Sequence, residues 1–169
     1  MLTELLAERR TSILKRWLGL ILGSYPAETA RFLLSERDRF ANPVGQTIAR
    51  EIEAAFDGVR SADEIESFTP ALEAIVKIRA VQDFGASQAV SFVFQLKRAI
   101  REELAPQIAS GAVTDGILEL ESRIDAVAGR CFDLYMSARE KIYELRANEL
   151  RRETYFLLER ATRGNGNNE

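Results

Sequence analysis

The 169-residue sequence contains no histidine and a single cysteine, Cys131. Without histidine the chain cannot supply a Ser-His-Asp or Cys-His catalytic centre, a histidine-ligated zinc or haem, or a phosphohistidine. One cysteine cannot form an intramolecular disulfide, which favours a reducing compartment. We therefore expect a cytoplasmic, non-catalytic protein that binds no haem and carries no cofactor.

Long apolar segments are also missing. The longest, WLGLIL at residues 17–22, is far shorter than the about 20 residues that a membrane-spanning helix needs. The N-terminus lacks the apolar core of a signal peptide. The net charge is −3, and basic residues alternate with glutamates. This pattern argues against a dedicated nucleic-acid binder. We expect neither a membrane span nor a nucleic-acid partner.

Helical periodicity is what the sequence does contain. Apolar residues recur at three- and four-residue steps nearly throughout, and no segment alternates as a half-buried strand would. The length suits one domain. The sequence predicts an all-α bundle of about six helices. Expected helices cover approximately residues 2–21, 26–33, 43–56, 70–81, 88–104 and 114–163, with starts at Pro26, Asn42-Pro43, Thr69-Pro70 and Ser87.

The last helix would extend about 75 Å at 1.5 Å per residue, which exceeds the diameter of a small domain. We assign residues 1–163 to one domain and 164–169 to a disordered tail. The first half of the helix carries one apolar stripe, at Ile117, Leu120, Ile124, Val127, Cys131, Leu134 and Ala138. A second stripe follows, at Tyr143, Ala147, Leu150, Thr154, Leu157 and Ala161. We predict that the first stripe packs in the core. The second is either a solvated amphipathic end or a homodimer seam, centred on Tyr143, Leu150 and Leu157.

The segment KIRAVQDFGASQAV, residues 77–90, places polar side chains between two apolar helices. Its DFG triplet matches protein kinases by chance, since the glycine-rich loop and the HRD motif are absent. We interpret Gly85 as a helix C-cap and Ser87 as an N-cap.

Capping leaves four polar residues of this corner unexplained, namely Arg79, Gln82, Asp83 and Gln88. Either they form a buried hydrogen-bond network that fixes the corner, or they present a polar surface to a partner.

Three further groups have a structural and a functional interpretation. Lys97, Arg98 and Arg101 form either a solvated face or, with Arg79, an exposed cationic docking patch. A second group of residues either packs in the core or lines a ligand pocket: Trp17, Phe92, Phe94 and Tyr135. Cys131 is either a buried inert thiol or a redox-sensitive one. Paired glutamates suit solvated helix faces, because a ferritin-like di-iron site also needs histidines.

Three segments resemble a known family: ILKRWLGLILGSYP (13–26), RDRFANPVGQTI (37–48) and IVKIRAVQDFGASQAVSFVFQLKRAIREEL (75–104). They are similar to the N-terminal domain of the RsbT co-antagonist proteins, the RsbR/RsbRD group of stressosome-type regulators. The resemblance implies a globin-like, haem-free, dimerising domain whose long helix leads to a STAS domain. Only RGNGNNE follows the expected helix, so we expect a stand-alone module without a STAS domain.

We therefore expect a regulatory or sensor domain in signalling that acts by dimerisation through the long helix and by contact with another signalling protein. A small-ligand-binding helical module, or an accessory partner of a larger complex, is the alternative.

Overall fold

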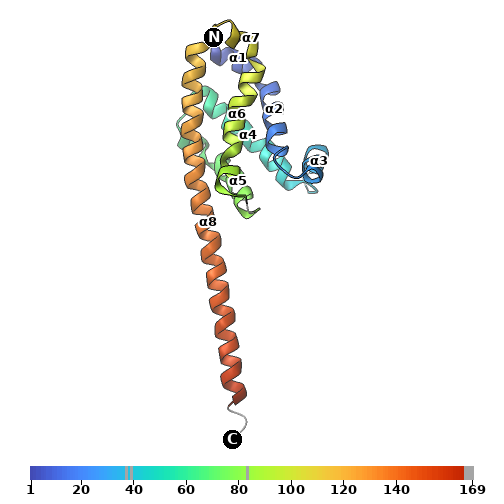
Figure 1. Cartoon of the computed structure of the whole chain (residues 1–169), viewed down its shortest axis with the longest axis vertical. Coiled ribbons are helices and arrows are strands. Elements are labelled where there is room, and N and C mark those ends of the chain that lie inside the picture. Colours follow the sequence, from blue (N-terminus) through green and yellow to red (C-terminus); the bar gives the residue numbers. More distant parts are fainter. Residues whose placement is uncertain (37, 39, 83, 166–169) are drawn as a thin grey trace.

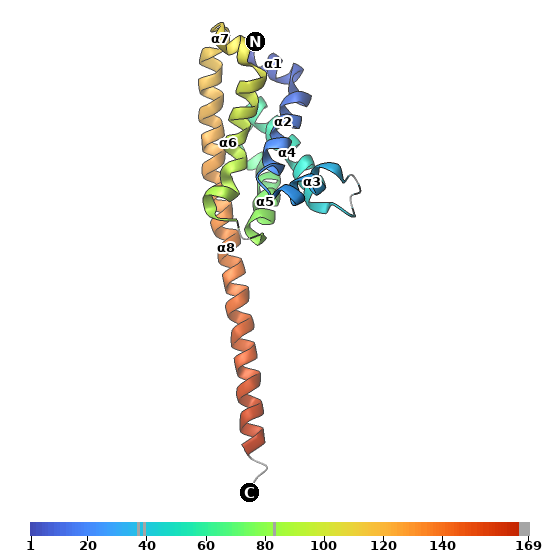
Figure 2. The same ribbon diagram turned by 45° about the vertical axis from the view of Figure 1, so that its right-hand side comes forward.

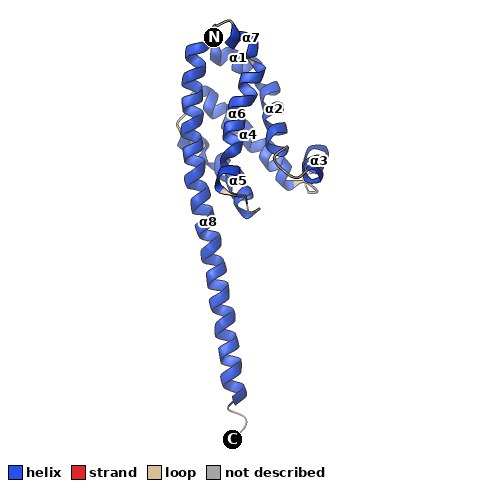
Figure 3. Cartoon of the chain, viewed as in Figure 1, coloured by secondary structure: helices blue, strands red, loops and turns tan. Residues whose placement is uncertain are grey.

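The computed structural model describes residues 1–36, 38, 40–82 and 84–165, with residues 162–165 described by their backbone alone. In these ranges the chain is all-helical (Figure 3). The described part contains eight helices: α1 (Leu2–Glu8), α2 (Arg10–Leu22), α3 (Ala27–Ser35), α4 (Pro43–Ser61), α5 (Ile65–Val81), α6 (Ala86–Glu103), α7 (Ala105–Ala109) and α8 (Thr114–Asn165).

The all-α class and the long C-terminal helix are confirmed, whereas about six helices was too few. The first expected helix is interrupted at Arg9, and the short α7 follows α6 at Leu104. The globin-like topology and the division into one domain and a tail stay predictions.

Helices α1 to α7 form a body beside one half of α8, and the other half of α8 projects away from this body (Figures 1 and 2). Within the body, α8 packs against α5 and α6, α4 packs against α5, and α2 packs against α6. α3 lies on the side of the body away from α8 (Figure 1). None of the described helices is both long and apolar enough to cross a membrane.

The start of α4 confirms the prediction at Asn42-Pro43. The Asn42 side chain is buried, and its Oδ1 accepts the Gly45 N–H at 2.8 Å. Its Nδ2 donates to the carbonyls of Leu33, at 2.9 Å, and Glu36, at 3.0 Å. One side chain thereby caps α4 and joins it to the end of α3.

The connection expected between residues 57 and 69 is wrong, and so is the start at Thr69-Pro70. α4 continues to Ser61, and α5 begins at Ile65. The earlier start buries Phe68 against α4, where an added Cβ on Gly58 would lie 2.3 Å from the Phe68 ring. This packing outweighs the cost of placing Pro70 inside α5.

The caps predicted between α5 and α6 are also wrong. α5 ends at Val81 with Gln82 as its cap, and Gly85 is the N-cap of α6 with φ −64°. Ser87 lies exposed in the first turn of α6. Gln88 Oε1 accepts the Gly85 N–H at 3.3 Å and takes the capping role instead.

α8 has 52 residues and a length of about 78 Å. Its first apolar stripe packs inward, as predicted; Ile124 and Cys131 are fully buried. Tyr135 is the last buried residue of α8 among the side chains that the structure describes. Every described side chain from Tyr143 to Leu158 is exposed.

Candidate functional site

The α5–α6 corner is built around Arg79, in the last turn of α5. Its side chain is 0% exposed. The rings of Phe84, Tyr25 and Phe92 surround the guanidinium, with centroids 4.7, 5.7 and 5.9 Å from Cζ. Nη2 donates to Ser24 Oγ at 2.7 Å. Three aromatic rings and one hydroxyl therefore offset part of the cost of burying this charge.

The guanidinium is not fully satisfied. Nε and Nη1 of Arg79 have no hydrogen-bond partner, and none of the described acidic side chains forms an ion pair with it. An unpaired buried donor costs about 1–3 kcal/mol, and more when it is charged. Burial lowers the pKa of the Arg79 guanidinium, and the neighbouring Tyr25 partly opposes this shift. An arginine nevertheless stays protonated in proteins, so the corner holds a buried positive charge.

An open pocket of about 590 Å³ lies in front of this charge. The lining residues come from the α2–α3 connection, α3 and the corner: Ser24, Tyr25, Pro26, Thr29, Gln82, Phe84 and Gln88. The Tyr25 hydroxyl donates to Gln82 Oε1 at 2.8 Å. Burial raises the pKa of Tyr25, which keeps the hydroxyl protonated as a donor.

The polar residues predicted for this corner therefore differ in position. Arg79 is buried, and Gln82 is exposed but linked to it through Tyr25. Gln88 lies at the rim of the pocket. Asp83 lies outside the described residues. A role of these residues in partner recognition stays a prediction.

The same corner is tied to α8 at the place where α8 leaves the body. The Tyr135 hydroxyl donates to the carbonyl of Phe84 at 2.7 Å. One turn later, Arg139 Nη1 donates to the carbonyl of Ala80 at 3.0 Å. These two hydrogen bonds join the corner to α8.

The four residues predicted to line a pocket do not surround one cavity in the described structure. Trp17 and Phe92 stack in the core with centroids 6.4 Å apart, and Trp17 Nε1 donates to the Phe92 carbonyl at 2.7 Å. Tyr135 instead donates its hydroxyl hydrogen bond to the Phe84 carbonyl at the corner. Phe94 lies elsewhere, half-exposed between α6 and α8. It follows Phe92 by two positions on α6, and side chains two positions apart on a helix point about 160° away from each other.

Of the cationic patch predicted from Lys97, Arg98, Arg101 and Arg79, the structure contradicts only the exposure of Arg79; a docking role of the other three stays a prediction. Arg79 is buried, and the other three form ion pairs. Lys97 binds Asp125 at 2.5 Å, and Arg101 binds Glu121. These two pairs join α6 to α8, so the charges serve helix packing.

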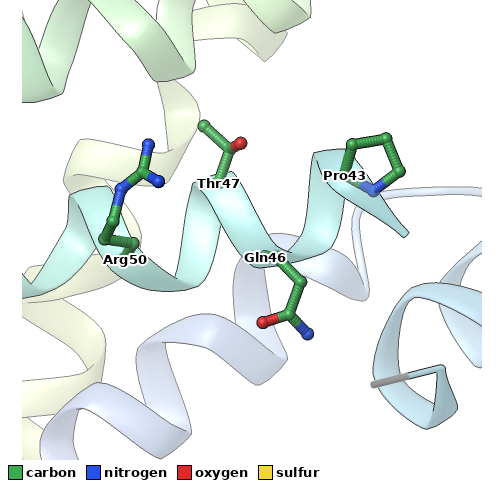
Figure 4. A pocket seen from close by; sticks show the side chains of 4 residues that line it. All are labelled: Pro43, Gln46, Thr47 and Arg50. Atoms are coloured by element: carbon green, nitrogen blue, oxygen red, sulfur yellow. The ribbon is translucent and has the colours of Figure 1, made fainter. Parts of the chain in front are cut away.

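A further hollow of about 410 Å³ lies on α4 (Figure 4). Thr47 and Arg50 lie on one side of the helix and Gln46 on the other (Figure 4). Arg50 is exposed and paired with Glu51 at 2.6 Å. This hollow offers no buried polar group to a ligand.

Cys131 is buried, as one of the two interpretations predicted. Burial raises the pKa of its thiol to about 12, which keeps it protonated. Among the described residues, no group of three or more His, Cys, Asp or Glu side chains could hold a metal ion.

The outer face of α8 forms a second candidate surface. Exposed residues recur at seven-residue steps along it: Gly129, Met136, Tyr143, Leu150 and Leu157. The three residues of the predicted seam are exposed, and the same spacing extends back to Met136 and Gly129; their role in a dimer stays a prediction. At its N-terminal end, at Gly129, the line meets an open, apolar hollow of about 720 Å³ that is also lined by Phe94 and Phe132. We call this line and hollow the outer apolar face. Gly129 and Met136 were not predicted to belong to this face, although the heptad spacing from Gly129 was a usable signal.

The family model of the RsbT co-antagonist protein rsbRD N-terminal domain matches residues 11–150. The chain belongs to this family. The resemblance seen in three sequence segments is thus confirmed, and the match includes the Arg79 corner, its pocket and the outer apolar face up to Leu150. The rsbRD N-terminal domain family is linked to stressosome signalling and is generally regulatory. No curated protein and no solved structure matches this chain.

Proposed function

We propose that this rsbRD N-terminal domain is a non-catalytic regulatory module that dimerises through the outer apolar face and passes a signal along α8 to another signalling protein. The observation that supports the proposal is the line of exposed residues at seven-residue steps on α8. Such spacing is typical of a helix that pairs with another helix.

The energetics favour a partner for this face. Leu150 and Leu157 are 64% and 66% exposed, whereas helices in proteins gain most of their stability from tertiary packing of an apolar face. Burying a leucine side chain contributes about 1.5–3 kcal/mol. A second copy offers the same face, so a two-fold symmetric dimer would bury the lines of both copies in one interface.

The upper part of the face also suits a second copy. An added Cβ on Gly129 would meet nothing within 4 Å, so the backbone of α8 is open to close approach there. Phe94 and Phe132, which are about half-exposed, flank this opening. Partner side chains can fill the hollow between α6 and α8 and continue the contact along α8.

Signal transfer would use the two hydrogen bonds from α8 to the corner. Tyr135 and Arg139 hold the corner carbonyls where α8 emerges. A stimulus that shifts the corner changes the direction or the pairing of the projecting half. Such a switch needs two states that differ in affinity for the stimulus or for the partner.

Matched substitutions on α8 test the dimer. Leu150→Glu places a charge in the proposed seam, whereas Leu145→Glu places one about 140° round the same helix. Both leucines are exposed, at 64% and 69%. We expect the unmodified chain and Leu145→Glu to be dimers by sedimentation equilibrium, and Leu150→Glu to be a monomer with unchanged helix content. A monomeric unmodified chain at high micromolar concentration, or equal masses for the two variants, would contradict the proposal.

A further inference from the structure

We propose that the pocket in front of the α5–α6 corner binds a small organic anion, whose carboxylate or phosphate group pairs with the guanidinium of Arg79. The starting point is the unusual state of this side chain. It is fully buried, and its Nε and Nη1 have no hydrogen-bond partner. Buried charges in proteins are ordinarily paired, so an unpaired one indicates a missing counterion.

The position of the charge connects it to the pocket. Ser24 accepts the hydrogen bond from Arg79 Nη2, and the rings of Tyr25 and Phe84 lie over the guanidinium. All three of these residues also line the pocket. The charge therefore lies directly behind the pocket wall. Ser24 is exposed, so the proposed pairing requires its side chain and the Tyr25 ring to move aside and open a path to the guanidinium.

The pocket lining indicates the chemistry of the ligand. Tyr25, Pro26 and Phe84 offer flat or apolar surfaces next to the charge, and Thr29 and Gln82 offer hydrogen bonds at the rim. The volume of about 590 Å³ is within the range of small-molecule sites. A fitting ligand has one anionic group directed at Arg79, a compact aromatic or apolar body, and a polar group at the outer end. Guanidinium groups pair with carboxylate and phosphate in the same bidentate geometry, so both classes fit.

Anion binding does not require a second copy of the chain, and in this respect the inference goes beyond the proposed function. Its regulatory consequence does rest on that function. Phe84 lines the pocket, and its carbonyl accepts the hydrogen bond from Tyr135 of α8. An anion at Arg79 would draw the wall of the pocket toward itself and change this contact.

Four probes test the charge requirement on the full chain: benzoate, phenyl phosphate, inorganic phosphate and the neutral benzamide. Binding is measured by isothermal titration calorimetry and by amide chemical shifts. We expect benzoate or phenyl phosphate to bind at least about tenfold more tightly than benzamide, since one charge-assisted pair is worth that factor or more. The largest shifts should fall on Ser24, Thr29 and Gln82. Binding by inorganic phosphate but by neither aromatic anion would contradict an organic ligand.

Two variants locate the binding site. Arg79→Met keeps the volume of the side chain, removes the charge and retains contact with the aromatic rings. We expect it to lose the preference for benzoate over benzamide. Should it fail to fold, Thr29→Trp tests the same pocket with Arg79 intact, because Thr29 is exposed and lines the pocket. It should block binding by steric filling. Arg50→Met, on the exposed hollow of α4, is the matched control and should bind as the unmodified chain does.

Three results would overturn the inference: affinities for benzoate and phenyl phosphate that both equal that for benzamide, an Arg79→Met variant that keeps the preference for the anion, or unchanged binding in Thr29→Trp. Absence of binding by all anionic probes at millimolar concentration would overturn it as well. The two proposals fail separately. A monomeric chain that binds benzoate through Arg79 contradicts only the dimer, and a dimer that binds no anion contradicts only the ligand site.

Discussion

The two halves of α8 are one continuous helix in two different environments. In the first half, Leu120 and Ile124 are 4% and 0% exposed; in the second, Leu145 and Leu157 are 69% and 66% exposed. The residue types are similar, and so is their helix propensity. The difference comes from neighbouring elements, because α5 and α6 cover only the first half. Apolar periodicity on a helix therefore indicates a contact but does not say which chain provides it.

The polar contacts differ in the same way. Lys97 and Arg101 of α6 bind carboxylates of α8 across the body. In the described part of the second half, the polar pairs stay within one or two turns of α8 itself, as between Tyr155 and Glu159. Pairs of this kind contribute only about 0.2–0.5 kcal/mol each. The projecting half thus lacks the tertiary contacts that stabilise the body.

The largest expected effect contrasts two apolar truncations on α8. Ile124→Ala leaves a cavity in the core and should lower the free energy of unfolding by about 2–5 kcal/mol. Leu145→Ala removes an exposed side chain away from the proposed seam and should change it by less than about 0.5 kcal/mol. Urea denaturation followed by circular dichroism measures both. Similar losses for the two variants would show that the projecting half contributes to the cooperative unit of the body.

The next effect contrasts two glycines, and here the expected signs are opposite. An added Cβ on Gly58 would overlap the buried Phe68 ring, so Gly58→Ala should destabilise the chain by about 1–3 kcal/mol. Gly129 has open space around its Cα, and alanine is the better helix former there. Gly129→Ala should stabilise the isolated subunit by about 0.5–1 kcal/mol. Thermal unfolding of the two variants in the monomeric Leu150→Glu background measures both signs. Destabilisation by Gly129→Ala in that background would show that α8 is tightly packed there within one subunit.

The smallest effect concerns pH and belongs to the body. Arg10 of α2 donates to Asp57 of α4 at 2.8 and 3.0 Å, and this guanidinium lowers the pKa of the Asp57 carboxyl. A lowered folded-state pKa contributes stability that is present above the unfolded pKa of about 3.9 and is lost as the pH falls through the folded value. Because the pair is partly exposed, its contribution is at most about 1 kcal/mol. Asp57→Asn should therefore be less stable than the unmodified chain at neutral pH, and this deficit should shrink as the pH falls toward 2.

Denaturant titrations at both pH values measure the difference between Asp57→Asn and the unmodified chain. The exposed Asp133→Asn on α8 serves as control and should change stability by less than about 0.5 kcal/mol at either pH. A deficit in Asp57→Asn that persists unchanged at low pH would assign the effect to packing instead of charge.

Much of the fold could be predicted because it depends on local signals. The start of α4 follows from the capping residue Asn42 and the placement of Pro43, and α8 begins at the predicted Thr114. The start of α5 could not be predicted, because it depends on Phe68 meeting Gly58 of another helix. The connection between α5 and α6 was misassigned for a related reason: Gly85 suits a helix end as well as a helix start, and packing decides between them.

The features of the candidate site also fall into those that local signals predict and those that tertiary packing decides. The sequence alone determined an all-helical chain with a long final helix, two apolar stripes on that helix and a group of polar residues at the α5–α6 corner, because periodicity and capping act over a few residues. Only the tertiary structure decided that Arg79 is enclosed by Tyr25, Phe84 and Phe92, and that the second stripe faces solvent. Burial depends on segments that lie far apart in the chain, and its cost or gain is set by what those segments place beside each side chain.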